Sequence, residues 1–239
     1  MEFSIDLGNT SYKVGGFEGS DLVLLKSFKS EEALVSFING EMPEKLIIAS
    51  VSQDAIATMA NFHADITCLA LDVHTPLPLE KQYHTPETLG VDRIAAAVGA
   101  WSLYQNKNIL VVDLGTCITY DLILANNTYQ GGAISPGMHM RLKALHNFTA
   151  RLPLVEPKED IDLIGKSTES SILSGVILGT AGEIETMIEK FRRNYADLHI
   201  IICGGDAKFF ESRIKAPIFV VPELVLIGLN RILQYNVST

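Results

Sequence analysis

The chain has 239 residues, of which 47% are hydrophobic and 20% are charged, and this composition excludes a disordered protein and indicates a globular one. Asp and Glu outnumber Lys and Arg by 28 to 19, and the net charge of −9 argues against nucleic acid or an anionic membrane as a partner. The three cysteines share no short spacing, so neither a disulfide scaffold nor a structural zinc site is expected. The acidic N-terminus and the short apolar runs indicate a soluble cytoplasmic protein.

Apolar runs and turn residues predict the elements of the first half in chain order. The expected strands are residues 3–7, 12–17, 22–28, 45–51 and 67–71. Ser30 is expected to cap a helix in which apolar residues recur at helical spacing, and Ser52 is expected to cap a second helix. Residues 72–90 have no regular pattern, and an Ala-rich helix should follow from about Pro86 or Gly90 to Tyr104.

The second half repeats this order. Its expected strands are residues 109–113, 118–125, 128–134, 198–203 and 218–221. Its expected helices run from Ser135-Pro136-Gly137 to about 148, over about 168–194 with an interruption at the glycines, shortly after 206, and from Pro222 to about 234. The order βββαβα therefore occurs twice, which predicts an α/β fold with duplicated halves at 1–104 and 105–239.

The two halves carry the same loop after their first strand. Asp-Leu-Gly followed by Asn or Thr begins at Asp6 and again at Asp113, 107 residues later. In the first loop, glycine lets backbone N–H groups approach phosphate oxygens, Asp6 offers Mg²⁺ an oxygen ligand through water, and Lys13 can neutralise a phosphate. A tight hairpin with Asp as a turn residue is the alternative, and the recurrence of the loop weakens it.

Asp92 and Arg93 lie where the long helix is expected to begin. A carboxylate there stays ionised because it meets the positive end of the helix dipole. Asp92 is therefore a candidate general base and Arg93 a candidate anion-binding residue. A capping Asp with an exposed Arg is the alternative, and the spacing leaves both open.

Two further segments have an open role. Residues 131–137 pair two glycines with Ser-Pro-Gly and enter a helix that contains Arg141. This pattern suits either an anion-binding helix end or a tight strand-to-helix turn. Asp121 shares a strand face with Cys117 and Thr119, and a buried Asp there is costly unless it is paired.

These motifs, in this order, resemble those of the type III pantothenate kinases of the acetate and sugar kinase/Hsp70/actin superfamily. The matching segments are the phosphate motifs at 6–13 and 113–121, the pantothenate motif Tyr-x-x-Pro-x-x-Leu-Gly-x-Asp-Arg at 83–93, Gly-Gly-x-Ile-x-Pro-Gly within 131–141, and Thr-x-x-Ser-Ile-x-Ser-Gly at 168–175. The resemblance implies duplicated ribonuclease H-like (actin-like ATPase) halves around a nucleotide cleft. It also implies ATP-dependent phosphorylation of pantothenate to 4′-phosphopantothenate, the first step of coenzyme A biosynthesis, by a homodimer that uses Mg²⁺ and a monovalent cation, K⁺ or NH₄⁺.

The resemblance also implies a role for each matching residue. Asp92 would accept the proton of the pantothenate hydroxyl. Contacts to ATP would come from Asp6, Leu7, Gly8, Asn9, Thr10, Ser11, Tyr12, Lys13 and Thr116. Pantothenate would be held by Tyr83, Gly90, Val91, Asp92, Arg93 and Thr168. The monovalent cation would bind Asp113, and Mg²⁺ would bind Asp6 through water.

Two other functions fit the same fold. A different small-alcohol kinase or a phosphohydrolase would be separated from a pantothenate kinase by a substrate panel. A nucleotide-dependent regulator would bind ATP without turnover. The presence of Asp6, Asp92, Arg93 and Asp113 argues against a regulator, and the sequence contains no convincing pair of DNA-binding helices.

Overall fold

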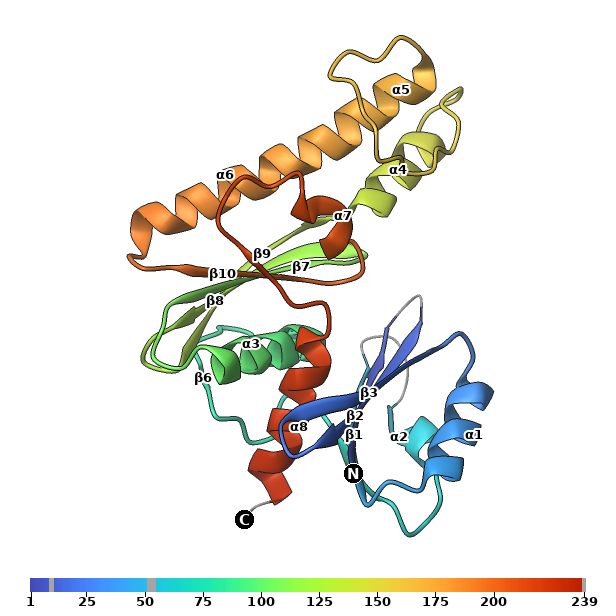
Figure 1. Ribbon diagram of the computed structural model, residues 1–239, viewed down its shortest axis with the longest axis vertical. Helices are drawn as coiled ribbons and strands as arrows, with labels where there is room; N and C mark the ends of the chain where they lie inside the picture. The colour runs from blue at the N-terminus through green and yellow to red at the C-terminus, as the bar shows by residue number, and fades with distance from the viewer. Residues whose placement is uncertain (9–10, 51–54, 238–239) are drawn as a thin grey trace. The chain divides into compact units, whose positions relative to one another are not determined.

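The computed structural model describes residues 1–8, 11–50 and 55–237 (Figure 1). The chain forms two compact units: unit 1 comprises Met1–Lys107, Leu122–Gly131 and Glu223–Thr239, and unit 2 comprises Asn108–Asp121 and Gly132–Pro222. The division into repeated halves at 1–104 and 105–239 is a statement about duplication and stays a prediction. Compactness divides the chain differently, because the C-terminal segment belongs to the same unit as the N-terminus.

Unit 1 is built on a five-stranded sheet in the order β3-β2-β1-β4-β5. Its strands are β1 (Glu2–Leu7), β2 (Tyr12–Glu18), β3 (Asp21–Phe28), β4 (Lys45–Ser50) and β5 (Thr67–Ala70). The first three strands are antiparallel neighbours, whereas β4 runs parallel to β1 and β5 runs parallel to β4. The four central residues of β4 are fully buried, which confirms that its continuous apolar run marks an internal parallel strand.

The helices of unit 1 are α1 (Glu31–Glu41), α2 (Ala55–Met59), the 3₁₀ turn η1 (Pro86–Thr88), α3 (Val91–Leu103) and α8 (Leu224–Val237). The predicted cap of α1 is confirmed, because the Ser30 hydroxyl accepts a hydrogen bond from the Ala33 backbone N–H at 3.3 Å. Helix α3 packs against α8. A Cβ at Gly228 would lie 1.8 Å from the Ala95 carbonyl oxygen, so the glycine allows the two helices to meet at backbone distance.

The second sheet repeats the strand order of the first. Its strands are β6 (Glu80–Lys81), β7 (Ile109–Leu114), β8 (Cys117–Leu124), β9 (Thr128–Pro136), β10 (His199–Cys203) and β11 (Phe219–Val220). The order β9-β8-β7-β10-β11 matches β3-β2-β1-β4-β5 strand for strand, and β6 is added beside β9. The fold is therefore α/β with two mixed sheets, as the alternating pattern predicts.

The helices of unit 2 are α4 (Met138–Asn147), α5 (Thr168–Leu173), the π-helical turn η2 (Ser174–Leu178), α6 (Gly179–Asn194) and α7 (Ala207–Glu211). The predicted interruption of the long helix at its glycines is wrong, because α5, η2 and α6 follow one another without a break. Among the described residues, Thr168–Asn194 is the one helix that is long and apolar enough to cross a membrane, by length and composition alone. Since 44% of its apolar stretch is buried inside the protein, it has the character of a core helix.

One helix begins later than predicted, and one predicted cap lies outside the described residues. The helix predicted to open at Ser135-Pro136-Gly137 begins later, because Ser135 and Pro136 extend β9 and Gly137 is the N-cap of α4. The expected cap Ser52 and the loop residues Asn9 and Thr10 lie outside the described residues.

Candidate active site

Asp6 lies near the end of the central strand of unit 1. It is the fifth of the six residues of β1, opposite Lys13 of β2 and beside Ala49 of β4. Burial raises the pKa of its carboxyl to about 6, Lys13 opposes this rise, and the negative charge of Asp92 adds to it. The structure therefore brings two predicted site carboxylates of the same unit within electrostatic reach of each other.

The loop after Asp6 is tight. A Cβ at Gly8 would lie 3.2 Å from the Ser11 carbonyl oxygen, and Leu7 pairs with Tyr12 where β2 begins. The Leu7 side chain is fully buried in the core of unit 1, so any contact of Leu7 with ATP is restricted to its backbone. Ser11, Tyr12 and Lys13 keep partial exposure.

Asp92 occupies the first turn of α3, as the second residue after the N-cap Gly90. Its Oδ1 accepts a hydrogen bond from the Arg93 backbone N–H at 2.9 Å. A Cβ at Gly90 would lie 2.4 Å from the same oxygen, so a larger residue at position 90 would clash with the Asp92 carboxylate where it now lies. The partly exposed Asp92 therefore meets the positive end of the helix, as predicted.

The alternative interpretation of this segment expected an exposed Arg93. The structure contradicts it, because only 6% of Arg93 is exposed. Its guanidinium carbon lies 6.0 Å from the centre of the Tyr83 ring. Tyr83 in turn packs beside Tyr129, with ring centres 6.2 Å apart, and against Gly131, whose φ of +83° favours glycine. The irregular segment before α3 thus places Tyr83 beside Arg93 within unit 1, and Gly90 and the partly exposed Val91 directly precede the Asp92-Arg93 pair along the chain.

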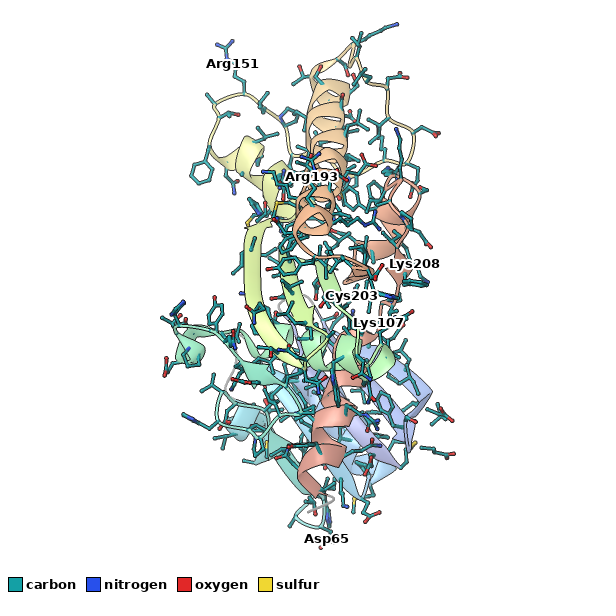
Figure 2. All side chains as sticks on the ribbon, turned by 90° about the vertical axis from the view of Figure 1, so that its left-hand side faces the viewer. Asp65, Lys107, Arg151, Arg193, Cys203 and Lys208 are labelled. Atoms are coloured by element: carbon teal, nitrogen blue, oxygen red, sulfur yellow. The ribbon has the colours of Figure 1, made fainter. Side chains whose placement is uncertain are left out.

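Asp113 occupies the corresponding position in unit 2. It is the fifth of the six residues of β7 and lies opposite Cys203 of β10, which Figure 2 labels. A Cβ at Gly204 would lie 2.4 Å from Asp113 Oδ1 and 2.5 Å from the Leu114 carbonyl oxygen. Gly204 has a φ of +91°, so the turn after β10 needs glycine for its backbone as well as for space.

Residues 204–206 follow β10 as a turn, and their contact with the second Asp-Leu-Gly loop was not predicted. The Asp206 backbone N–H donates to the Leu114 carbonyl at 2.9 Å, which fixes the turn on the second Asp-Leu-Gly loop. Burial raises the pKa of the Asp206 carboxyl. The His139 side chain, whose Nε2 lies 3.6 Å from Asp206 Oδ1, opposes this rise. Paired glycines directly after a buried strand were the available signal.

Thr116 and Thr168 also belong to unit 2, and both are exposed. Thr116 accepts a backbone hydrogen bond from Gly137 at 3.1 Å. Thr168 opens α5, directly after the cap Ser167. Their predicted contacts with ATP and pantothenate stay predictions. Among the described residues, no group of three or more His, Cys, Asp or Glu side chains is arranged to hold a metal ion.

Comparison with known proteins adds the family. A family model described as type III pantothenate kinase matches residues 2–190. The type III pantothenate kinase of Cytophaga hutchinsonii is 44% identical over 241 residues, covering 99% of this chain and 100% of the relative.

Solved structures show the fold. A Campylobacter jejuni protein described as a conserved candidate transcriptional activator of the Baf family has a TM-score of 0.66 at 20% identity, covering 99% of this chain and 100% of that chain. A glucokinase from an Antarctic psychrotroph has a TM-score of 0.54 at 12% identity, covering 98% of each chain. These identities are low, so the likeness carries the actin-like kinase fold alone. Because the family model matches most of the chain and the curated relative matches nearly all of it, the chain belongs to the type III pantothenate kinases, enzymes that phosphorylate pantothenate with ATP in coenzyme A biosynthesis.

Proposed function

We propose that the enzyme transfers the γ-phosphoryl group of ATP to the primary hydroxyl of pantothenate, with Asp92 as the general base. The observation that carries this role is the place of Asp92, a partly exposed carboxylate in the first turn of α3 and within the pantothenate motif. A primary hydroxyl has a high pKa, so Asp92 accepts its proton late, as the bond to phosphorus forms. The product is 4′-phosphopantothenate.

Arg93 pairs with the carboxylate of pantothenate in this proposal. A guanidinium binds a carboxylate through two parallel hydrogen bonds, and low exposure strengthens such a pair. Tyr83, stacked near the guanidinium, limits where the side chain of Arg93 can point. The backbone of Gly90 and Val91 and the hydroxyl of Thr168 complete the substrate contacts that the family resemblance implies.

The loop 6–13 contributes the contacts to the phosphates of ATP, with Asp6 as the residue that holds Mg²⁺ through water. The carboxylate fits this ion, because burial and the charge of Asp92 leave Asp6 short of compensating positive charge. Mg²⁺ is commonly bound by one or two carboxylates with phosphates and water, so a larger protein cluster is not required. When bound, Mg²⁺ supplies charge neutralisation of the β- and γ-phosphate oxygens.

Asp113 holds the monovalent cation, K⁺ or NH₄⁺, and Thr116 contacts ATP. A carboxylate at the end of β7, packed on the backbone of the Gly204 turn, offers the oxygen ligands that K⁺ prefers. We further propose that the enzyme is a homodimer, as the family resemblance implies, and that it is cytoplasmic, as its composition indicates. Sedimentation analysis at micromolar concentration tests the oligomeric state.

The experiment is a coupled assay of ADP release with pantothenate, ATP, Mg²⁺ and K⁺. We expect pantothenate-dependent turnover that falls sharply when Na⁺ replaces K⁺. Asp92→Asn should lower kcat at least about 100-fold with an unchanged melting temperature. Asp65→Asn, at an exposed position paired with His63, is the matched control and should leave kcat unchanged. Full turnover by the Asp92 variant would exclude the proposed base.

A further inference from the structure

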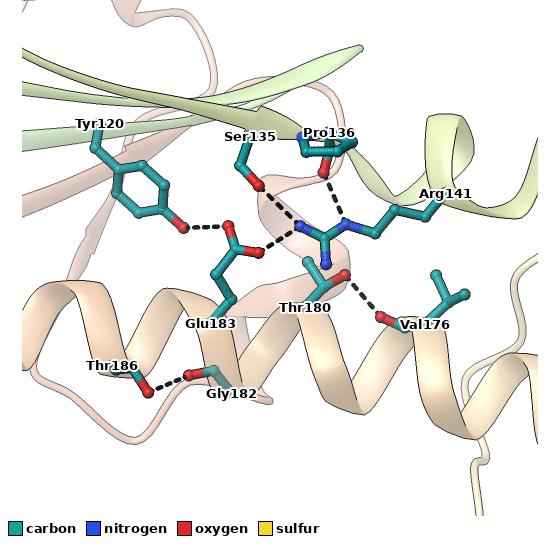
Figure 3. Close-up of polar contacts among 9 residues, drawn as sticks. All are labelled: Tyr120, Ser135, Pro136, Arg141, Val176, Thr180, Gly182, Glu183 and Thr186. Atoms are coloured by element: carbon teal, nitrogen blue, oxygen red, sulfur yellow. Dashed lines mark hydrogen bonds and ion pairs between the residues drawn. The ribbon is translucent and has the colours of Figure 1, made fainter. Parts of the chain in front are cut away.

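We propose that Arg141 and Glu183 are positioning residues that hold the second phosphate loop, residues 114–117, in the place where phosphoryl transfer requires it. The two side chains come from α4 and α6 of unit 2 and meet at the end of β9 (Figure 3). Neither residue belongs to the predicted catalytic or binding set. This inference rests on the proposed role of Thr116 in contacting ATP.

The Arg141 guanidinium joins three partners. Its Nε donates to the Pro136 carbonyl at 2.8 Å, and its Nη2 donates to the Ser135 hydroxyl at 3.0 Å. The same Nη2 forms an ion pair with Glu183 Oε2 at 2.5 Å. Arg141 therefore ties the last two residues of β9 to α6.

Glu183 is held on its other side. Its Oε1 accepts a hydrogen bond from the Tyr120 hydroxyl at 3.1 Å, so both carboxylate oxygens are engaged (Figure 3). Burial works against the charge of Glu183, but the hydrogen bonds from Arg141, Ser135 and Tyr120 outweigh it and lower the pKa of the carboxyl. We call Arg141, Glu183, Ser135 and Tyr120 the clamp.

The clamp differs from an ordinary surface ion pair. The Arg141 and Glu183 side chains are 23% and 28% exposed, whereas the nearby pair Arg193–Glu189 on α6 is 73% and 58% exposed. Charge-assisted hydrogen bonds strengthen as water is excluded, while exposed pairs contribute little. The Arg141–Glu183 pair, which joins α4 to α6, therefore has the capacity to fix the position of the neighbouring backbone, whereas the exposed Arg193–Glu189 pair does not.

The backbone that it fixes leads directly to the phosphate loop. Gly137 follows Pro136 and donates its N–H to the Thr116 carbonyl at 3.1 Å. A Cβ at Gly137 would lie 2.2 Å from the Gly115 carbonyl oxygen and 2.6 Å from that of Thr116, so turn and loop are in backbone contact. A shift of the 135–137 turn must move residues 115 and 116 with it.

A merely structural clamp would lower stability and leave the kinetic constants alone. A positioning clamp must act on the nucleotide side of the reaction, because the loop it holds is assigned to ATP. Errors of about 1 Å in positioning cost up to roughly 100-fold in rate. We therefore expect Arg141→Gln and Glu183→Gln each to lower kcat/KM for ATP by roughly tenfold and to leave KM for pantothenate within about twofold.

The matched controls are Arg193→Gln and Glu189→Gln, which make the same changes at the exposed pair on the same helix. They should keep the wild-type kinetic constants. Arg141→Lys keeps the charge but lacks the planar fork, so it should restore only part of the activity. The double variant Arg141→Gln/Glu183→Gln should lose little more than either single variant, since both remove one interaction.

If a clamp variant does not fold, Ser135→Ala removes the hydrogen bonds of the Ser135 hydroxyl with Arg141 and Glu183 without changing charge and should still raise KM for ATP. Wild-type kinetic constants in folded clamp variants would overturn the proposal, as would an equal rise of both KM values. Absence of turnover in the wild-type enzyme would instead refute the proposed function. In that case calorimetry still tests the clamp. A higher dissociation constant of MgATP in the clamp variants than in the wild type would support the proposal, and equal constants would overturn it.

Discussion

The raised pKa of Asp6 predicts that this residue destabilises the ligand-free protein at neutral pH. The folded state holds the proton with a pKa of about 6, whereas the ordinary value is 3.8. The folded protein therefore binds this proton more tightly than the unfolded chain does. The favourable contribution is complete below pH 3.8 and is lost as the pH rises through 6.

The magnitude follows from the shift. About two pKa units at 1.36 kcal/mol each give a penalty of about 3 kcal/mol at pH 8, and about half of it remains at pH 5. The figure is an upper bound, because Asp6 keeps partial exposure and water screens its charge. The attraction of Lys13 is already contained in the pKa.

The test is Asp6→Asn, which has nearly the same shape and cannot ionise. Urea unfolding with EDTA should show the variant more stable than wild type by up to about 3 kcal/mol at pH 8, with the gain roughly halved at pH 5. Addition of Mg²⁺ and ATP should stabilise the wild type and not the variant.

Asp72→Asn is the control of opposite sign. The hydrogen bond from the Thr75 hydroxyl, opposed by burial and supported by the backbone N–H groups of His74 and Thr75, lowers the pKa of Asp72. That variant should therefore lose stability at pH 8. An Asp6 variant no more stable than wild type at pH 8, or a gain that does not shrink at pH 5, would refute the reasoning.

Three further predictions concern glycines. Gly90→Ala should displace the Asp92 carboxylate, because the new Cβ would lie 2.4 Å from its Oδ1. We expect kcat to fall at least about tenfold with little change in melting temperature. An unchanged kcat would contradict this prediction. Gly228→Ala should destabilise unit 1 by about 1–3 kcal/mol, since its Cβ meets the Ala95 carbonyl at 1.8 Å. Gly182→Ala, in an open position on α6, should instead stabilise the protein by about 0.5–1 kcal/mol in the same denaturation experiment.

The architecture was largely readable from local signals. Continuous apolar runs identify β4 and β7 as internal strands, and the recurrence of Asp-Leu-Gly places Asp6 and Asp113 at the same position of two central strands. Ser30 forms the cap that its residue type predicts. Where the pattern failed, at Ser135 and Pro136, strand pairing of β9 continued through residues that resemble a helix start.

The candidate site was only partly readable. The motif around residues 83–93 identifies Asp92 and Arg93, but the spacing left open whether Arg93 is exposed. Burial of Arg93 near Tyr83 shows that this arginine is not exposed. Tyr83 in turn contacts Tyr129 and Gly131, more than 40 residues away from it in sequence.

The sequence by itself determined the family, the repeated strand order and the identity of the acidic loops, because each is written in neighbouring residues or in a motif of fixed spacing. Only the tertiary structure decided that Glu183 meets Arg141 and that Gly204 lies on Asp113. These partners are 42 and 91 positions apart in the chain, and no local pattern encodes the distance between them. Pairing of β10 with β7 brings Gly204 to Asp113, and an ion pair between α4 and α6 joins Arg141 to Glu183. This packing also sets the exposure and the electrostatic environment of each charge.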